Sequence, residues 1–278
     1  MLPIYIINLS SDNKKRDRIK AILNNLGLKY TIVNAINGNQ LTKEEINQVY
    51  SKNKALKEMK RELKPSEIGC ALSHISIYNK ITSENINSAI ILEDDTVIDH
   101  EIHTIENIIE SLPEDWDLLL LGHSDTPNGV QSVCKTWIST PTLKKASIAK
   151  PLVTVGGAYG YAITQKGARK LINATEVLCR TIDNYTGDYR TSNLYALYPN
   201  MIRVDFGLGS AIQQDRENAI KDLRSTSYQT RSKLKNKSSL YRKLSRINKK
   251  RREKRKWSFL CLIRIIRHKI RTNKLLLK

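Results

Sequence analysis

Three consecutive acidic residues, Glu93, Asp94 and Asp95, follow the apolar run 88–92 and are the most informative chemical feature of the sequence. Such a run predicts a buried β-strand, and ligands of open α/β sheets bind at the carboxyl ends of strands. Three carboxylates there repel one another and lose solvation unless a cation neutralises them. Mn²⁺ or Mg²⁺ would bridge carboxylate and diphosphate oxygens, and would stabilise a departing nucleoside diphosphate. The alternative is a solvated acidic turn.

The elements around this motif alternate between strands and helices. Apolar runs predict strands over residues 4–9, 30–33, 88–92, 117–121, 153–163, 194–198 and 202–204. Helical spacing of apolar residues predicts helices over 16–26, 41–63, 66–81, 102–111 and 165–173, with Pro65 as the stop of the second helix. This alternation indicates an α/β fold with a mostly parallel central sheet flanked by helices.

Basic residues are concentrated at the end of the chain. Residues 221–278 hold 22 of the 47 Lys and Arg residues but two of the 27 acids, so this segment carries the whole net charge of +20. The neutral remainder has no bulk attraction to nucleic acid, whereas the basic segment would bind any polyanion. Because the composition changes after about Arg224, we expect a folded domain over 1–224 and a helical tail over 225–278.

The four cysteines, at positions 70, 134, 179 and 261, have no spacing typical of a zinc site or a redox motif. They are typical of reduced thiols in a cytosolic protein, and Cys70 is expected in the core. The sequence opens directly into a predicted strand, so no secretory signal is expected. No stretch reaches the roughly 18 apolar residues that a membrane span needs.

Four segments of the sequence resemble glycosyltransferase family 25, which includes bacterial lipooligosaccharide transferases and collagen galactosyltransferase domains. In order, they are YIINL at 5–9 with Arg16 and Arg18 downstream, EIGCALSH at 67–74 with Tyr78, ILEDD at 91–95, and GGAYGYAI at 156–163. The resemblance covers roughly residues 3–205. It implies a GT-A-type fold, a UDP-sugar donor that is usually UDP-galactose, a divalent metal, and inversion at the anomeric carbon.

The resemblance also implies roles for the donor site. Asp95 is expected to bind the metal, together with Asp205, while Asp94 or Glu93 holds the ribose or a metal-bound water. Asn8, at the tip of the first strand, would read the base, and an arginine downstream would balance phosphate charge. The loop from Ala35 to Gly38 would line the base pocket. The donor-binding residues expected on this basis are Asn8, Arg16, Ala35, Asn37, Ser73, Glu93 and Asp94.

Catalytic candidates come from the helix that carries His74 and from three aspartates. His74 is expected to contact the donor phosphate or shape the acceptor side, although a helical histidine among apolar neighbours is also typical of packing. Inversion in one step needs a general base for the acceptor hydroxyl. Asp183, Asp188 and Asp205 are the candidates, and we favour Asp183 over Asp188. Asp205 is an alternative metal ligand or loop contact, and each aspartate also fits a turn or cap.

The tail must be interpreted physically, because the resemblance stops before it. Its apolar and basic residues from Trp257 to Arg271 alternate as in an amphipathic helix, which inserts into anionic membrane surfaces. We therefore expect an inverting β-galactosyltransferase that acts on a lipid-linked or lipooligosaccharide acceptor at the cytoplasmic face of a bacterial inner membrane. No specific nucleic-acid binding is expected. The alternative is a non-catalytic protein that binds membranes or polyanions through its tail.

Overall fold

A computed structural model of the protein describes residues 2–123, 133–138, 147–151 and 153–209. The predicted tail over 225–278, and the boundary placed at residue 224, lie outside these residues. The strands are β1 (Ile4–Asn8), β2 (Thr31–Asn34), β3 (Ser88–Glu93), β4 (Thr96–Ile98), β5 (Leu118–Leu120), β6 (Val133–Ile138), β7 (Ser147–Pro151), β8 (Gly160–Thr164), β9 (Leu194–Tyr198) and β10 (Ile202–Val204). The helices are α1 (Asn13–Asn25), α2 (Lys43–Val49), α3 (Lys52–Glu58), α4 (Pro65–Ser83), α5 (Ile105–Glu110), α6 (Gln165–Ala174) and α7 (Ile182–Thr186), with the 3₁₀ turns η1 (Gly38–Gln40), η2 (His100–Thr104) and η3 (Phe206–Leu208).

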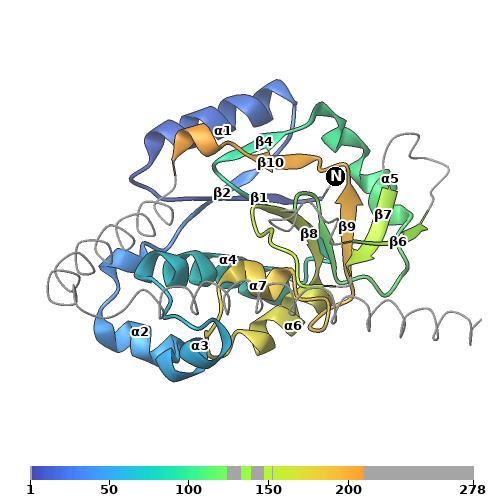
Figure 1. The fold of residues 1–278 in the computed structure, drawn as a ribbon. Helices are drawn as coiled ribbons and strands as arrows, with labels where there is room; N and C mark the ends of the chain where they lie inside the picture. The colour runs from blue at the N-terminus through green and yellow to red at the C-terminus, as the bar shows by residue number, and fades with distance from the viewer. Residues whose placement is uncertain (1, 124–132, 139–146, 152, 210–278) are drawn as a thin grey trace, which may run out of the picture. The chain divides into compact units, whose positions relative to one another are not determined.

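Eight of these strands form a central sheet in the order β2-β1-β3-β8-β5-β9-β7-β6 (Figure 1). Strand β1 pairs in parallel with both β2 and β3, and β5 pairs in parallel with β9. Strands β8 and β7 run antiparallel to each of their neighbours. Six of the eight strands therefore share one direction, which confirms an α/β fold with a mostly parallel central sheet. Strands β4 and β10 form a separate antiparallel pair.

The central strands are buried on both faces because helices cover each face of the sheet. On β1, Tyr5 and Ile7 pack in the cluster that contains the apolar residues of α4 and α6. The alternate residues Ile4 and Ile6 pack in the cluster that contains those of α1 and α5. Figure 1 shows α1 on one side of the sheet and α4, α6 and α7 on the other. Burial on both faces explains why these strands are continuous apolar runs rather than alternating ones.

The helix expected over residues 41–63 is wrong in extent. The chain forms the short helices α2 and α3 there, because Tyr50 adopts an extended conformation and makes a β-bridge with Leu178. Ser51 then caps α3 by accepting a hydrogen bond from the backbone of Lys54. Pro65 does not stop a helix but begins α4, where its missing N–H would have no partner within the helix.

The strand expected over residues 153–163 is also too long, since β8 begins only at Gly160. The preceding segment is a tight loop in which Gly157 has φ +147°, and a Cβ there would lie 2.6 Å from the carbonyl oxygen of Gly122. These glycines therefore allow backbone to pack against backbone. No helix among the residues described here is long and apolar enough to cross a membrane.

Candidate active site

The parallel strands β2, β1 and β3 bring polar side chains to one edge of the sheet. In the strand register Asn8 lies beside Asn34, and Ile7 lies beside Glu93, so the three strands end side by side. Asp94 and Asp95 follow directly in the turn between β3 and β4. The sequence motif therefore lies at the carboxyl edge of the sheet, where ligands of such folds bind.

The carboxylates of Asp94 and Asp95 lie close together and share one basic partner. Lys15 Nζ lies 3.6 Å from Asp94 Oδ1 and 3.6 Å from Asp95 Oδ2. Asn8 Nδ2 donates a 2.7 Å hydrogen bond to the other oxygen of Asp94. Asp95 is 8% exposed, and among the described residues its buried Oδ1 has no hydrogen-bond partner. An orphaned buried carboxylate oxygen beside a second carboxylate fits a hard divalent cation, which prefers oxygen ligands.

Helix α1 supplies the basic side of this edge. Arg16 Nε donates a 2.7 Å hydrogen bond to Asn8 Oδ1, and Arg16 Nη2 lies 3.4 Å from Asn34 Oδ1. Lys15 was missed as a site residue in the sequence analysis. The sequence feature that could have identified Lys15 is the run of basic residues 14–16 in the first turn of α1. Three cations there are unusual, because the helix dipole disfavours positive charge at the N-terminal end of a helix. In the structure the carboxylates of Asp94 and Asp95 supply the negative charge that Lys15 meets.

Glu93 begins a chain of polar groups that runs into the core. His74 Nε2 lies 3.4 Å from Glu93 Oε1, and His74 Nδ1 lies 2.8 Å from the hydroxyl of Tyr161, which lies 2.6 Å from that of Tyr78. Burial, and then the charges of Asp95 and Asp94, raise the pKa of Glu93 well above its ordinary value. Burial lowers the pKa of His74 to about 4, so its imidazole is neutral at neutral pH. The two tyrosines were not identified as site residues from the sequence.

Ser73 holds the loop after β2 instead of facing the strand edge. Its hydroxyl accepts a 2.8 Å hydrogen bond from the backbone of Ile36 and donates one to the carbonyl of Gly69. Ala35 is tied to β1 through a 2.8 Å backbone hydrogen bond to Asn8, and Asn37 caps η1. The predicted loop from Ala35 to Gly38 is thus fixed beside the carboxyl edge, and Ser73 positions it.

Asp183 and Asp188, the two favoured candidates for the general base, have different surroundings. Asp183 lies in the first turn of α7 and is partly buried. Burial raises the pKa of Cys70, and the charge of Asp183 adds to that increase. Burial lowers the pKa of His74, and the charge of Asp183 partly opposes that decrease. Apolar residues of α7 and α4 pack in the same cluster, so Asp183 lies on the helix beside the one that carries Cys70 and His74. Asp188 is 3% exposed and forms ion pairs with Arg190 and Arg180 at 2.7 and 2.9 Å.

These partners decide the protonation of Asp188. Burial alone would raise its pKa, but the hydrogen bonds from Arg190 and Arg180 outweigh burial and lower the pKa to about 2. A carboxylate that is this weakly basic and accepts hydrogen bonds from two guanidinium groups is a poor proton acceptor near neutral pH. We therefore interpret Asp188 as a residue that stabilises the fold around α7 through its two ion pairs.

Asp205 reaches the site mainly through its backbone. Its N–H donates a 2.8 Å hydrogen bond to the carbonyl of Asp95, whereas its carboxylate binds Arg18 at 3.0 Å and caps η3 through Gly207. Arg18 also donates to the carbonyl of Thr96. The carboxylate of Asp205 is thus engaged by the guanidinium of Arg18. It positions the turn that carries Asp95.

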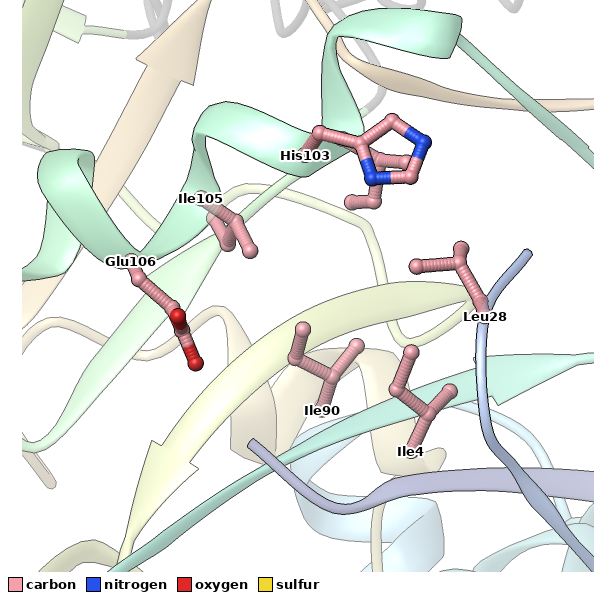
Figure 2. Close-up of a pocket in the computed structure, with 7 residues that line it drawn as sticks. Ile4, Leu28, Ile90, His103, Ile105 and Glu106 are labelled. Atoms are coloured by element: carbon pink, nitrogen blue, oxygen red, sulfur yellow. The ribbon is translucent and has the colours of Figure 1, made fainter. Parts of the chain in front are cut away.

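A cavity lies at the opposite ends of the same strands. It is lined by Ile4, Leu28, Ile90, Ile102, His103, Ile105 and Glu106, and Figure 2 shows the apolar side chains of both strands facing α5 there. Ile4 and Ile90 pair near the start of β1 and within β3, away from Asn8 and Asp94. The cavity is therefore separate from the polar edge of the sheet.

Comparison with known proteins identifies the family. The model of glycosyltransferase family 25 (LPS biosynthesis protein) matches residues 1–186. The chain is 29% identical over 188 residues to procollagen galactosyltransferase 1-A of Xenopus laevis, and 27% identical over 188 residues to procollagen galactosyltransferase 2 of Homo sapiens. The matches cover 62% of this chain but only 28% and 27% of those relatives. The chain belongs to glycosyltransferase family 25.

Family membership alone does not establish catalysis. The chain is also 25% identical over 188 residues to a human protein named inactive glycosyltransferase 25 family member 3, over 61% of this chain and 28% of that relative. Activity must therefore be argued from the site. The edge of the sheet around Asp94 and Asp95 lies within the matched residues, whereas Asp188 and Asp205 lie beyond them.

Proposed function

We propose that this protein is a metal-dependent glycosyltransferase with a GT-A-like fold, which transfers galactose from UDP-galactose to a hydroxyl acceptor with inversion. One observation carries the proposal: the buried, orphaned Oδ1 of Asp95 lies beside Asp94 at the carboxyl edge of β1, β2 and β3. The two relatives named as galactosyltransferases support galactose as the sugar.

Asp95 and Asp94 would hold Mn²⁺ or Mg²⁺. When bound, this cation would offset the negative charge of the departing UDP. Lys15 lies 3.6 Å from both carboxylates and is placed to contact the donor's phosphates. Arg16, fixed by Asn8 and Asn34, would meet the same phosphates or the ribose. The rigid loop 35–38 would then line the base.

Asp183 is the general base in this proposal. Single-step inversion requires a carboxylate or another base on the acceptor side to take the proton of the attacking hydroxyl. Asp183 lies on α7, which packs in the same apolar cluster as the helix that carries Cys70 and His74. The ion pairs of Asp188 with two arginines make it the weaker candidate. Glu93, supported by neutral His74, would orient the donor sugar or ribose between them.

The acceptor is proposed from the family description and from the basic tail. A lipid-linked or lipooligosaccharide glycan fits a family whose model is described by LPS biosynthesis, and an anionic membrane surface would attract residues 225–278. We infer on this basis that the enzyme acts at the cytoplasmic face of a bacterial inner membrane. The names of the procollagen relatives make a hydroxyl on a protein the second class of acceptor to test.

The first experiment measures UDP release from a panel of UDP-sugars with Mn²⁺, with Mg²⁺ and with EDTA. The intact chain is compared with Asp95→Asn, and Asp17→Asn is the matched control because Asp17 is an exposed acid on α1. We expect metal-dependent release from one donor, lost in Asp95→Asn and retained in the control.

Two results would count against the proposal. UDP release that is insensitive to EDTA would show that the reaction does not need a divalent metal. No release from any donor, together with no thermal stabilisation by UDP and Mn²⁺, would instead favour the non-catalytic alternative that binds membranes or polyanions through the tail. The existence of a relative named inactive makes this second result a real possibility to measure.

A further inference from the structure

Three side chains of types that can bind metals lie together beneath the acidic edge. Cys70 and His74 are four residues apart on α4, which places them on one face of the helix. Glu93 approaches them from the end of β3. One ligand atom from each of the three residues lies within 4.8 Å of the others. The sequence analysis found no zinc-like spacing because the third residue joins only through the fold.

Two of the distances between these ligand atoms can be compared with those of a tetrahedral zinc site. Glu93 Oε1 lies 3.4 Å from His74 Nε2 and 3.9 Å from Cys70 Sγ. Zinc ligands at their usual bond lengths of roughly 2.0–2.3 Å are separated by about 3.3–3.6 Å in a tetrahedral site. The distance from Cys70 Sγ to Glu93 Oε1 is slightly longer than this, and all the ligand atoms lie within 4.8 Å of one another, so a bound cation would draw Cys70 Sγ inward.

The surroundings of His74 match those of a metal ligand. Metal-bound histidines usually engage their second ring nitrogen with a fixed partner, which sets the tautomer and the ring orientation. His74 Nδ1 lies 2.8 Å from Tyr161 Oη, the two rings stack at 5.8 Å between centroids, and Tyr78 Oη lies 2.6 Å from Tyr161 Oη. Nε2 is thereby directed at Glu93.

The ligand types separate this cluster from the proposed donor site. A thiolate and an imidazole favour borderline and soft cations such as Zn²⁺, whereas the carboxylates of Asp94 and Asp95 favour Mg²⁺ and Mn²⁺. Access is available because the side chain of Glu93 is 27% exposed, while His74 is fully buried. Three protein ligands also leave a fourth position open for water or a substrate oxygen.

We propose that Cys70, His74 and Glu93 form a binding site for one thiophilic divalent cation of the Zn²⁺ class. The site is distinct from the Mn²⁺ or Mg²⁺ site of the proposed transferase. Binding displaces the proton of the Cys70 thiol to solvent, since the thiolate is the ligand form. Because Glu93 borders both sites, a cation held here would withdraw its carboxylate from the donor.

The test uses Co²⁺ as a spectroscopic substitute for Zn²⁺ on the reduced, chelator-treated full chain. A cobalt–thiolate bond gives a near-ultraviolet charge-transfer band, which carboxylate ligands do not give. We expect the band to saturate at one Co²⁺ per chain and to disappear when Zn²⁺ is added. Cys70→Ser should abolish it, and Cys179→Ser should not, because Cys179 is a buried free thiol beside Tyr185.

Further variants keep the test independent of folding and of the transferase proposal. Glu93→Gln and Tyr161→Phe should retain the band but require more Co²⁺, the latter by roughly 10–100-fold, as removal of a partner of a metal-bound histidine does elsewhere. Asp95→Asn should retain the band at one Co²⁺ per chain, because Asp95 is not a ligand of this site. Thermal melts establish that each variant is folded. The absence of a band in the intact chain, or a band that survives Cys70→Ser, would overturn the site, whatever the outcome of the UDP-release assay.

Discussion

Replacing Lys15 with methionine should have opposite effects on the two ligands of the proposed donor site. Lys15 Nζ lies 3.6 Å from an oxygen of Asp94 and 3.6 Å from an oxygen of Asp95, and its side chain is 12% exposed. In the free protein this ammonium neutralises the carboxylates that would bind the divalent cation. Methionine keeps most of the volume and removes the charge, so the cation no longer competes with a bound ammonium.

The magnitude follows from the distances and the burial. Two unit charges about 4 Å apart interact by about 1 kcal/mol in water and about 4 kcal/mol at an effective dielectric constant of 20. The side chains of Lys15, Asp94 and Asp95 are 11–14% exposed, between these two environments. We expect Lys15→Met to strengthen Mn²⁺ binding by about 1–3 kcal/mol, which is about 5- to 150-fold in the dissociation constant. UDP binding at saturating Mn²⁺ should weaken, because the phosphates lose a cation.

Both constants can be measured without turnover, by calorimetric titration with Mn²⁺ alone and then with UDP in excess Mn²⁺. Lys14→Met is the matched control, since Lys14 is exposed in the same helical turn. Asp95→Asn in the Lys15→Met background should cancel the gain in Mn²⁺ affinity. Weaker or unchanged Mn²⁺ binding in Lys15→Met would refute the assignment of these two carboxylates as the cation site.

Three further predictions concern the supports of the site. Gly69→Ala should lower the free energy of unfolding by about 1–3 kcal/mol despite alanine's higher helix propensity, because the new Cβ would lie 2.4 Å from the backbone nitrogen of Gly38; urea melts measure this. Asp188→Asn should lower the free energy of unfolding by about 2 kcal/mol above pH 4, because the pKa of Asp188 in the folded chain, about 2, lies below its ordinary value of 3.8. The difference in stability between the two proteins should shrink as the pH falls from 3.8 towards 2, and urea melts between pH 2 and pH 7 test this direction. Asp183→Asn should reduce sugar transfer by roughly 10²–10⁴-fold with unchanged UDP affinity, and an equal loss of UDP affinity would exclude it as the base.

The strands of the sheet were predictable where burial leaves a strong pattern. Strands β1, β3 and β9 are continuous apolar runs because helices cover both of their faces. Their directions were not predictable in full: an apolar run reads the same in a parallel or an antiparallel strand, and β8 lies antiparallel between β3 and β5. The break at Tyr50 escaped prediction for a related reason, since its bridge to Leu178 is a contact between distant parts of the chain.

The site was predictable to the extent that its residues follow strand ends. Asn8 and Asp94 could be placed together because parallel neighbouring strands end at one edge, and the structure joins them by a 2.7 Å hydrogen bond. Side-chain partners could not be deduced in this way. The arginines that hold Asp188 are close in sequence, yet only the fold shows that both guanidinium groups reach its carboxylate. Cys70 packs against the core as expected, but only the fold shows that its thiol also lies 3.9 Å from Glu93.

The residues at this edge are arranged at a cost to the free protein. Within the part of the chain that the structure describes, Asp95 has a buried oxygen without a hydrogen-bond partner, and the pKa of Glu93 is raised by burial and by its acidic neighbours. Both features disfavour the folded chain, and both are relieved when cations bind. By contrast, the supporting groups are fully satisfied: Ser73 bonds to two backbone groups, and Asp188 is paired with two arginines. Buried polar atoms without a hydrogen-bond partner also occur elsewhere among the described residues, for example at Ser66, Asp117 and Ser192. The oxygen of Asp95 differs from these because it lies at the carboxyl ends of the parallel strands, where Asp94 and Lys15 add further charge.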